Sequence, residues 1–507
     1  MQRKGGEAPD ASKCVRLFVL TDSKGRKRKR SIDYRSYNEL SAKVPEDDVI
    51  PFDITKFVLY KENVDTQYVL SLLARHLKIK PSRLGYAGTK DKRGITGQWC
   101  TAFKVPPKKL WYFNKTVLSR SRICLGNFQG ANESLKLGDL RGNLFEVILR
   151  EANEADRAKM VAAVKLFETR GFLNYYGMQR FGTGGTPTHK IGIPLLKGEW
   201  RLACKLILTE RGADDDAVKD AKRRLVGMLD TGKQELSAED KTELRETLKL
   251  LPRNAIGERA VVKGMLDYGL AGLAEALRCV PKTLRLMYMH AYQSYLWNNA
   301  ASTRIESFSS EHAVAGDIVY KKAAAEGAEG GEGGAEVAEG EGGEGALENP
   351  HELKPIRFVT EEEEREKSVG IDEVLLPLPG QKVSYPKHGV ADVYKTLLAA
   401  DGISFDDSAH TFRDFSTKSL AGAYRNVLQV PKSLEYSFIK YSDKNEQLVR
   451  TDYEEVRSKG GNKNRPSTRI EAGEYLALKL DFELPSSAYA TMAVRQLTGG
   501  KVLGMVQ

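Results

Sequence analysis

The segment LGYAGTKDKRGITGQ, residues 84–98, combines four glycines with one acidic residue and three basic residues. The acidic residue is Asp91, and its basic neighbours are Lys90, Lys92 and Arg93. Glycine permits positive φ and lets a backbone approach a ligand closely, so we expect a ligand-facing loop here. Because nearby positive charge favours the charged form of a carboxyl group, we expect Asp91 to be ionised at neutral pH.

Two other interpretations of this loop are open from its residues alone. A solvated turn that carries an Asp–Lys pair is common in proteins. A phosphate-binding loop is disfavoured, because the aspartate would repel the phosphate and the pattern GxxxxGK[ST] is absent.

Regular elements are expected on both sides of the loop. The pattern predicts a short strand over residues 57–60, followed by a helix whose apolar residues recur at helical spacing over 68–77. Asn63 or Asp65 is expected to cap that helix. A second strand is predicted over 99–105, so Asp91 should be held between rigid elements, where functional side chains are positioned best.

The charge balance points to a polyanionic partner. The chain of 507 residues, long enough for two or three domains, carries a net charge of +11. Residues 326–348 hold eight glutamates and no other charged residue, so the rest of the chain carries +19 once these eight negative charges are set aside. Nucleic acid is the first expectation for so basic a body.

Membrane and metal partners are not expected. No apolar run approaches the roughly 20 residues that a membrane span needs, and the N-terminus lacks the apolar segment of a secretory signal. The five cysteines, at positions 14, 100, 124, 204 and 279, form no CxxC pair and have no histidine at ligand spacing. Dispersed thiols fit the reducing interior of the nucleus or the cytoplasm, or both.

Two segments of biased composition are expected to lie outside the packed core. Residues 24–30, KGRKRKR, suit a nuclear-import signal, an arm on RNA phosphates, or the tip of a hairpin between strands at 15–20 and 31–34. Residues 323–349 consist mostly of alanine, glutamate and glycine, and we expect a disordered insertion because they cannot bury a core.

The loop motif GTKDKRGITGQ resembles the catalytic motif of the TruD family of RNA pseudouridine synthases. Further segments resemble that family in the same order, from about residue 52 to the C-terminus, and the first is typical of its eukaryotic branch. They are FVLYKENVDT at 57–66, LRGNLFEVILR at 140–150, GFLNYYGMQRFGT at 171–183, MHAYQSYLWN at 289–298, LPLPG at 376–380 and LPSSAYATMAVRQL at 484–497.

The resemblance implies an α+β fold with a discontinuous catalytic domain. Its sheet would be mixed and mostly antiparallel, and a helix-rich TRUD domain would be inserted into it. The implied division is a basic segment at 1–50, catalytic parts at 51–170 and 425–507, and the insertion at 171–424. RNA would lie in a basic cleft between the domains of a monomer.

The implied activity is isomerisation of uridine to pseudouridine without a metal, nucleotide or redox cofactor. We expect tRNA as the substrate, at a site of the uridine-13 type, with small nuclear RNA and messenger RNA as alternatives. In the family an aspartate acts at the sugar of a flipped-out uridine, and Asp91 falls on that position. An ionised carboxylate suits chemistry at an anomeric carbon.

Asn143 and Phe145 fall on the family's next motif, within RGNLF. There the amide helps to hold the site and the ring stacks on the target base, which needs such a surface once it is extruded. From the residue alone, a phenylalanine in a strand is more often a core residue.

Further RNA contacts are expected from two groups of residues. Lys90, Lys92 and Arg93 surround Asp91 in the loop. The motif NYYGMQRFG contributes Asn174, Gln179, Arg180 and Phe181, for which a hinge that packs aromatic residues is the alternative.

One feature of the family is not found in residues 1–50, namely a strand that supplies a basic partner for the aspartate. Lys56 or Lys92 could substitute for that partner. The rival function is a non-catalytic RNA-binding protein on the same fold, which would need the basic body but not Asp91.

Overall fold

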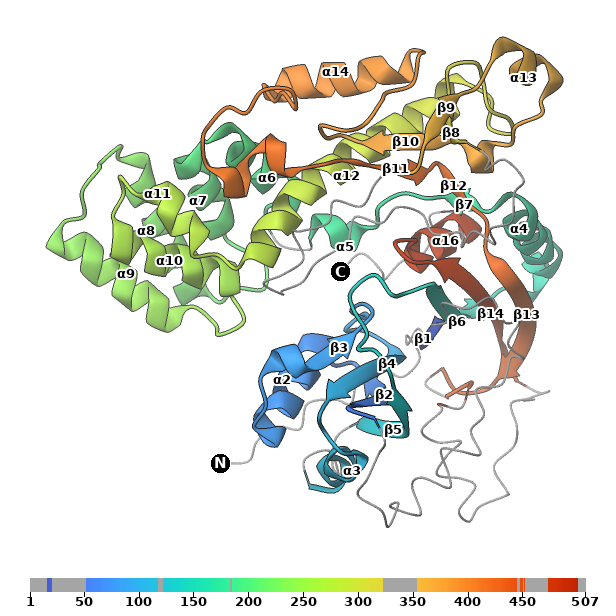
Figure 1. Ribbon diagram of the computed structural model, residues 1–507, viewed down its shortest axis with the longest axis horizontal. Helices are drawn as coiled ribbons and strands as arrows, with labels where there is room; N and C mark the ends of the chain where they lie inside the picture. Colours follow the sequence, from blue (N-terminus) through green and yellow to red (C-terminus); the bar gives the residue numbers. More distant parts are fainter. Residues whose placement is uncertain are drawn as a thin grey trace. The chain divides into compact units, whose positions relative to one another are not determined.

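The computed structural model describes residues 52–116, 122–182, 185–321, 353–444, 447–449, 451 and 473–499, and the backbone of 16–20 (Figure 1). The basic run at 24–30 and the acidic tract at 323–349 therefore lie outside the described residues. Among the described residues, no helix combines the length and the apolar character that a membrane crossing requires.

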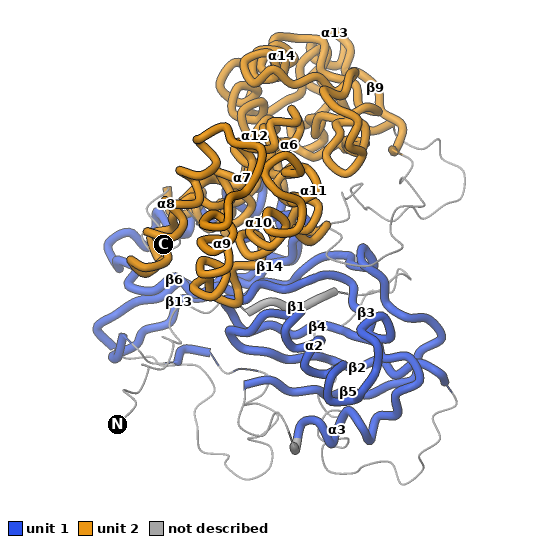
Figure 2. The backbone as a smooth tube through the Cα atoms, turned by 90° about the vertical axis from the view of Figure 1, so that its left-hand side faces the viewer, with its two compact units in different colours: residues 1–171, 330–339, 430–490 blue, residues 172–329, 340–429, 491–507 orange. Residues whose placement is uncertain are grey.

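The chain divides into two compact units (Figure 2). The first comprises residues 1–171, 330–339 and 430–490, and the second comprises residues 172–329, 340–429 and 491–507. Each unit is described separately below.

The first unit is built on an eight-stranded sheet with the order β13-β14-β6-β1-β4-β2-β5, and β3 pairs with β4 beside β1. All strand pairs are antiparallel except β1 and β4, so the sheet is mixed, as predicted. The strands are β1 (Arg16–Leu20), β2 (Ile54–Glu62), β3 (Leu84–Tyr86), β4 (Ile95–Phe103), β5 (Ile123–Ala131), β6 (Gly142–Ala152), β13 (Lys432–Tyr441) and β14 (Tyr475–Pro485).

Three helices accompany this sheet: α2 (Thr66–Leu77), α3 (Pro107–Thr116) and α4 (Arg157–Arg170) (Figure 1). Short 3-10 turns precede β3 at Pro81–Arg83 and α4 at Glu154–Asp156. Phe57 and Leu59 of β2 pack with residues of α2 and α3, because alternate residues of a strand face the same side. This helix-covered face, the side of the sheet to which Phe57 and Leu59 point, carries the site described below.

Helix α2 has both of its ends fixed. Asp65 is the N-cap and accepts a hydrogen bond from the Tyr68 N–H at 2.9 Å, which settles the choice between Asn63 and Asp65. Lys78 ends the helix in the left-handed conformation. Three residues connect the end of β2 to the start of α2, so these two ends lie close together.

Residues 31–34, expected as the second strand of an N-terminal hairpin, lie outside the described residues, whereas β1 lies at the expected first strand. It pairs with β4 along one edge and with β6 along the other. Within the described residues, the strand expected at 15–20 is therefore an interior strand of the sheet.

The second unit is rich in helices, as the family resemblance implied. They are α5 (Met178–Phe181), α6 (Thr188–Lys197), α7 (Trp200–Leu208), α8 (Asp216–Asp230), α9 (Ala238–Leu250), α10 (Ile256–Tyr268), α11 (Leu273–Arg278), α12 (Lys282–Ser307), α13 (Glu361–Glu366) and α14 (Val390–Asp401). Helix α16 (Ala490–Leu497) begins at the boundary of the two units.

Two small sheets belong to the same unit. Strands β8 (Ile318–Tyr320), β9 (Ile356–Phe358), β10 (Leu375–Leu378) and β11 (Ala423–Asn426) form an antiparallel sheet, and β7 (Phe172–Leu173) pairs with β12 (Leu428–Gln429). Short 3-10 turns lie at Ile371–Glu373, Arg413–Phe415 and Thr417–Ser419.

Helix α12 forms the centre of the second unit. Tyr292 and Trp297 are fully buried, and the indole N–H of Trp297 donates to the Leu376 carbonyl at 3.1 Å. Gln293 donates to the Pro379 carbonyl at 2.6 Å. The aromatic stripe of this helix is therefore core, which is the usual meaning of such a stripe.

Candidate active site

Asp91 lies in the loop of residues 87–94, which connects β3 to β4. The side chain of Thr66, at the start of α2, accepts a hydrogen bond from the Lys90 N–H at 3.2 Å and lies 3.2 Å from Gln98 Oε1. The Gln98 amide in turn donates to the Gly88 carbonyl at 3.1 Å. Buried polar groups of α2 and β4 therefore fix the loop on the N-terminal side of Asp91.

Gly94 fixes the other side of the loop. Its φ of 142° is a conformation that side chains with a Cβ rarely adopt. Its N–H donates to Asn63 Oδ1 at 3.0 Å, and its carbonyl accepts from the Asn63 N–H at 2.9 Å. Among the four glycines of residues 84–98, Gly94 has the positive φ, so the freedom expected of all four is used there alone.

Lys61 holds the centre of the loop from β2. Its ammonium group donates to the Asp91 carbonyl at 2.8 Å and lies 3.3 Å from the Lys90 carbonyl. The side chain is fully buried. Sequence reasoning missed this residue, although Phe57 and Leu59 establish an apolar alternation that position 61 continues. A lysine in place of the expected apolar side chain was the signal that could have revealed it.

Lys56 is placed away from the loop. Alternation puts residues 56 and 61 on opposite faces of β2, and Lys56 Nζ lies 4.6 Å from the centre of the Trp99 ring. Of the two cations that the sequence offered as partners of the aspartate, Lys56 is therefore on the wrong face. Lys92 is exposed in the loop.

The electrostatics of Asp91 combine two opposing effects. The residue has exposed surface, yet the protein atoms around its carboxyl group desolvate it and raise its pKa. The positive charges of Lys90 and Lys61 lower the pKa but do not outweigh desolvation. The cations thus act in the direction that the sequence predicted, whereas the net shift is in the opposite direction.

The same environment acts on Lys61. Burial lowers its pKa to about 8, while the charges of Asp65 and Asp91 oppose that fall. Asp91 in the loop and Lys61 on β2 are therefore an acid and a base whose pKa values both move toward neutrality, an arrangement typical of functional sites.

Strand register brings the RGNLF motif onto the same face of the sheet. Lys61 pairs with Thr96, Thr96 with Leu17, and Leu17 with Phe145. Directly paired residues project to the same side, so Phe145, and with it Asn143 two residues earlier, lies on the face from which Lys61 reaches the loop.

Phe145 is packed in the core of the first unit. It is 5% exposed and stacks on Phe482, with 5.6 Å between the ring centres. Phe167 of α4 meets the same Phe482 ring edge-on at 5.5 Å. A base platform at Phe145 would need ring surface that these contacts now cover, so that role stays a prediction.

Asn143 is placed differently. Its Oδ1 is buried and accepts no hydrogen bond from the described residues. Buried acceptors are nearly always paired, so this oxygen is a candidate acceptor for a substrate group that reaches it. The preceding Gly142 lets β14 pass closely, since a Cβ there would lie 2.4 Å from the Leu484 carbonyl oxygen.

The three predicted cations of the loop differ in exposure. Lys90 is 7% exposed, and its ammonium lies 3.3 Å from the Thr89 carbonyl. Lys92 and Arg93 are exposed. Lys90 therefore acts mainly on Asp91 through its charge, whereas the other two are accessible to a phosphate backbone.

The motif NYYGMQRFG belongs to the second unit, and Asn174 is bound within it. Asn174 is 5% exposed, its N–H donates to the Val427 carbonyl at 2.9 Å, and its amide donates to Asn426. Arg425 donates to the Asn174 carbonyl at 2.9 Å and to its Oδ1 at 2.6 Å. These bonds hold Asn174 in place within the second unit, which is a structural role.

The other three residues predicted as RNA contacts in this motif are more accessible than Asn174. Arg180 is partly buried and donates to Ser294 Oγ at 3.1 Å, and Phe181 meets the His189 ring edge-on at 5.5 Å. Gln179 is exposed. Their roles as RNA contacts stay predictions.

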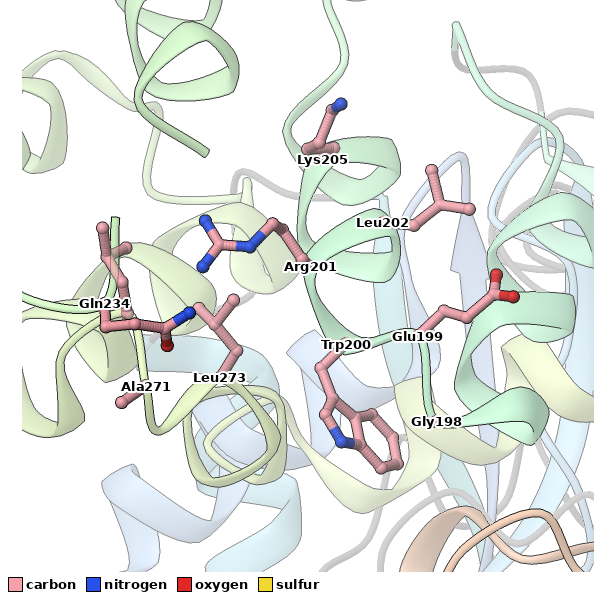
Figure 3. Close-up of a pocket in the computed structure, with 10 residues that line it drawn as sticks. Gly198, Glu199, Trp200, Arg201, Leu202, Lys205, Gln234, Ala271 and Leu273 are labelled. Carbon is pink, nitrogen blue, oxygen red and sulfur yellow. The ribbon is translucent and has the colours of Figure 1, made fainter. Parts of the chain in front are cut away.

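A separate pocket of about 550 Å³ lies in the second unit and contains none of the predicted site residues (Figure 3). Arg201 extends toward Gln234 in it, but already donates to two carbonyl groups, those of Leu229 and Lys233. Lys205 pairs with Asp230, and Glu199 with Lys197. Because these charges are already paired, the pocket is not a strong candidate for a charged ligand.

Comparison with known proteins connects this chain to one family. The family model of tRNA pseudouridine synthase D (TruD) matches residues 22–497. A mouse protein named pseudouridylate synthase 7 homolog is 36% identical over 442 residues, covering 87% of this chain and 58% of the relative. The multisubstrate pseudouridine synthase 7 of Schizosaccharomyces pombe is 35% identical over 443 residues, covering 87% and 61%.

The fold has a counterpart among solved structures. A crystal structure from Methanosarcina mazei, assigned as tRNA pseudouridine synthase D, superposes with a TM-score of 0.59 at 21% identity. The match covers 96% of this chain and 91% of that one. By contrast, the chain spans about three fifths of the length of the curated relatives it matches.

Proposed function

This chain belongs to the TruD family of pseudouridine synthases, and we propose that it isomerises uridine to pseudouridine in RNA. The observation that carries the proposal is the fixed position of Asp91. Polar side chains from β2, α2 and β4 hold the loop on both sides of this carboxyl group. Such support is what a catalytic group requires and a solvated turn does not.

The proposed role of Asp91 is to act at the sugar of a uridine that has left the base stack. The bond between C1′ and N1 of the uracil breaks, the uracil turns, and a new bond joins C1′ to C5. The proton displaced from C5 is lost as N1 gains one, so the product is an isomer of the substrate and no oxidant or reductant is consumed.

Asn143 is proposed to bind the target nucleotide through its Oδ1, which accepts no hydrogen bond from the described residues. Lys92 and Arg93, both exposed, are proposed to contact phosphates beside the target. Such contacts supply affinity without sequence readout. Roles for Phe145 as a base platform, and for Gln179, Arg180 and Phe181 as RNA contacts, are kept as part of the proposal.

We propose tRNA as the first substrate, at a site of the uridine-13 type, with small nuclear RNA and messenger RNA as alternatives. A nuclear or cytoplasmic location and a monomeric state are further proposals. The word multisubstrate in the name of the fission-yeast relative supports testing more than one class of RNA.

Tritium release from RNA labelled at uridine C5 tests the proposed function. Purified protein is incubated with unmodified tRNA, small nuclear RNA and messenger RNA transcripts, and RNA binding is measured by gel shift at rising salt. Release from at least one RNA is expected. Salt-sensitive binding to all of them without release from any would instead support the non-catalytic RNA-binding protein.

A further inference from the structure

Among the residues that the structure describes, the buried ammonium group of Lys61 has no close negative partner. Its side chain has no exposed surface, and among the described residues no carboxylate lies within ion-pair distance of it. Its nearest acceptors are two backbone carbonyls. A buried charge without a paired counterion is costly to stability, and a methionine of similar length would fill the same space. Because the charge is kept in spite of this cost to stability, we expect it to have a function.

The two carbonyls belong to consecutive residues. Lys61 binds the carbonyl of Lys90, which precedes the Asp91 Cα, and the carbonyl of Asp91, which follows it. One ammonium group therefore holds the peptide planes on both sides of that Cα. Because the two planes set φ and ψ of Asp91, the contact fixes the direction in which its side chain leaves the backbone.

The other charges that face Lys61 come from α2 and from the loop. Asp65 lies at the start of α2, Asp91 and Lys90 lie in the loop, and the residues paired with Lys61 on β4 and β5 are the uncharged Thr96 and Ile123. Lys61 and Lys90 both favour the ionised form of Asp91. Lys61 also binds the loop backbone at Asp91 itself.

We propose that Lys61 is a positioning residue of the isomerisation, which fixes the backbone of Asp91 and supplies positive charge that keeps the carboxyl group ionised. This inference rests on the proposed function. It places the basic partner of the aspartate on β2, within the segment FVLYKENVDT and on the face opposite Lys56.

The charge of Lys61 is expected to be lost within a practical assay range, because burial lowers its pKa to about 8. The fraction of protonated Lys61 falls as pH rises through that value, so turnover should fall on the alkaline side. Arginine stays protonated in proteins, so Lys61→Arg should move this fall to higher pH.

The test measures kcat, KM and RNA affinity between pH 6 and 9 for the wild type, Lys61→Met, Lys61→Arg and Lys56→Met. Lys61→Met should lower kcat by about 100-fold, because a small misplacement of a catalytic group has effects of that size. Its RNA affinity should stay within about threefold, since Lys61 is buried and cannot meet a phosphate. Circular dichroism and thermal unfolding confirm that each variant is folded.

Lys56→Met is the matched control, because it removes the same charge from the opposite face of the same strand. It should keep the kcat and the alkaline limb of the wild type. If Lys61→Met does not fold, Lys61→Arg decides: an alkaline limb that moves to higher pH supports the inference, and an unchanged limb overturns it.

Two failures are distinguishable in this design. An active wild type with a folded Lys61→Met variant of equal kcat overturns the role of Lys61 and leaves the synthase activity in place. A wild type that binds RNA but releases no tritium at any pH removes the proposed function, and the inference about Lys61 fails with it.

Discussion

The chemistry of the loop depends on how three charged side chains share a small volume. Lys61 and Lys90 are buried, and both act on the carboxyl group of Asp91. Desolvation is the larger effect on that group and raises its pKa. As pH falls through this raised pKa, the ionised fraction of Asp91 falls. Turnover should therefore begin to fall at a higher pH than it would with an aspartate of ordinary pKa.

Removing the charge of Lys90 should move the acid limb of the kcat–pH profile to higher pH. Lys90→Met deletes the largest charge effect that lowers the pKa of Asp91, so a higher pH is needed to ionise the carboxyl group. The pH profile of kcat checks this expectation. Lys92→Met is the control, since its side chain is exposed and should change RNA affinity instead. Equal acid limbs in the two variants would contradict it.

Asn143 should matter for substrate and little for stability. Its Oδ1 makes no hydrogen bond with the described residues, so Asn143→Ala should change the free energy of unfolding by less than about 1 kcal/mol. Turnover should fall by about tenfold or more, the effect of losing one or two hydrogen bonds to substrate. Chemical denaturation and tritium release measure the two effects.

Asn114→Ala is the matched control for that substitution. The Asn114 side chain accepts from the Leu125 N–H at 2.9 Å and donates to the Leu125 carbonyl at 2.6 Å. Its loss should destabilise the protein by about 1–3 kcal/mol, with turnover of the folded fraction unchanged. A large loss of stability in Asn143→Ala with normal turnover would show that Asn143 is structural.

At the scale of elements, buried polar contacts connect helices to strands in the second unit. Arg304 of α12 donates to both carboxyl oxygens of Asp317, which directly precedes β8, at 2.9 and 2.6 Å. Both side chains are fully buried, and His388 binds the same carboxyl group at 3.0 Å. The pair fixes the end of α12 beside the first residues of the four-stranded sheet.

Arg304→Met should destabilise the protein by about 3–5 kcal/mol, because it leaves the Asp317 carboxylate buried without its main partner. Arg357→Met is the control: its ion pair with Glu363 is partly exposed, so the loss should stay below about 1 kcal/mol. Urea denaturation of the two variants at pH 7 makes the comparison. Equal losses in the free energy of unfolding would contradict the claim that the buried ion pair matters more than the partly exposed one.

The same pair has a predictable pH dependence. Burial alone would raise the pKa of Asp317, but the bonds from His388 and Arg304 outweigh it and lower the pKa. The stabilisation is therefore present above the ordinary aspartate pKa and is lost as pH falls through the lowered value. The difference in stability between the wild type and Arg304→Met should narrow in acid for this reason.

At the scale of the whole molecule, local patterns predicted the elements better than their pairing. Local patterns predicted a strand at 57–60 within β2, the helix α2 with its cap, and a strand at 99–105 that overlaps β4, and the family resemblance supplied the mixed sheet. The partners of β1 could not be read from local pattern, because residues far apart in the chain, 95–97 and 142–146, occupy its two edges.

The candidate site was also predictable only where local sequence carries the signal. Asp91 stands out because glycines and cations surround it in the sequence. The role of Lys61 and the direction of the Asp91 pKa shift both depend on burial, which arises only when β2, α2 and the loop pack together. Composition counts charges but does not show which of them are removed from water.

The most direct test of the proposed enzyme compares Asp91→Asn with the wild type in tritium release and in RNA binding, with Asp53→Asn, an exposed aspartate of the same unit, as control. Asp91→Asn keeps the shape of the side chain and removes its charge. Turnover should fall by about 10³-fold or more, the scale of losing a catalytic group, while RNA affinity stays within about tenfold and Asp53→Asn behaves as wild type. Retained turnover in Asp91→Asn, or a loss of RNA binding in step with turnover, would contradict a catalytic aspartate at this position.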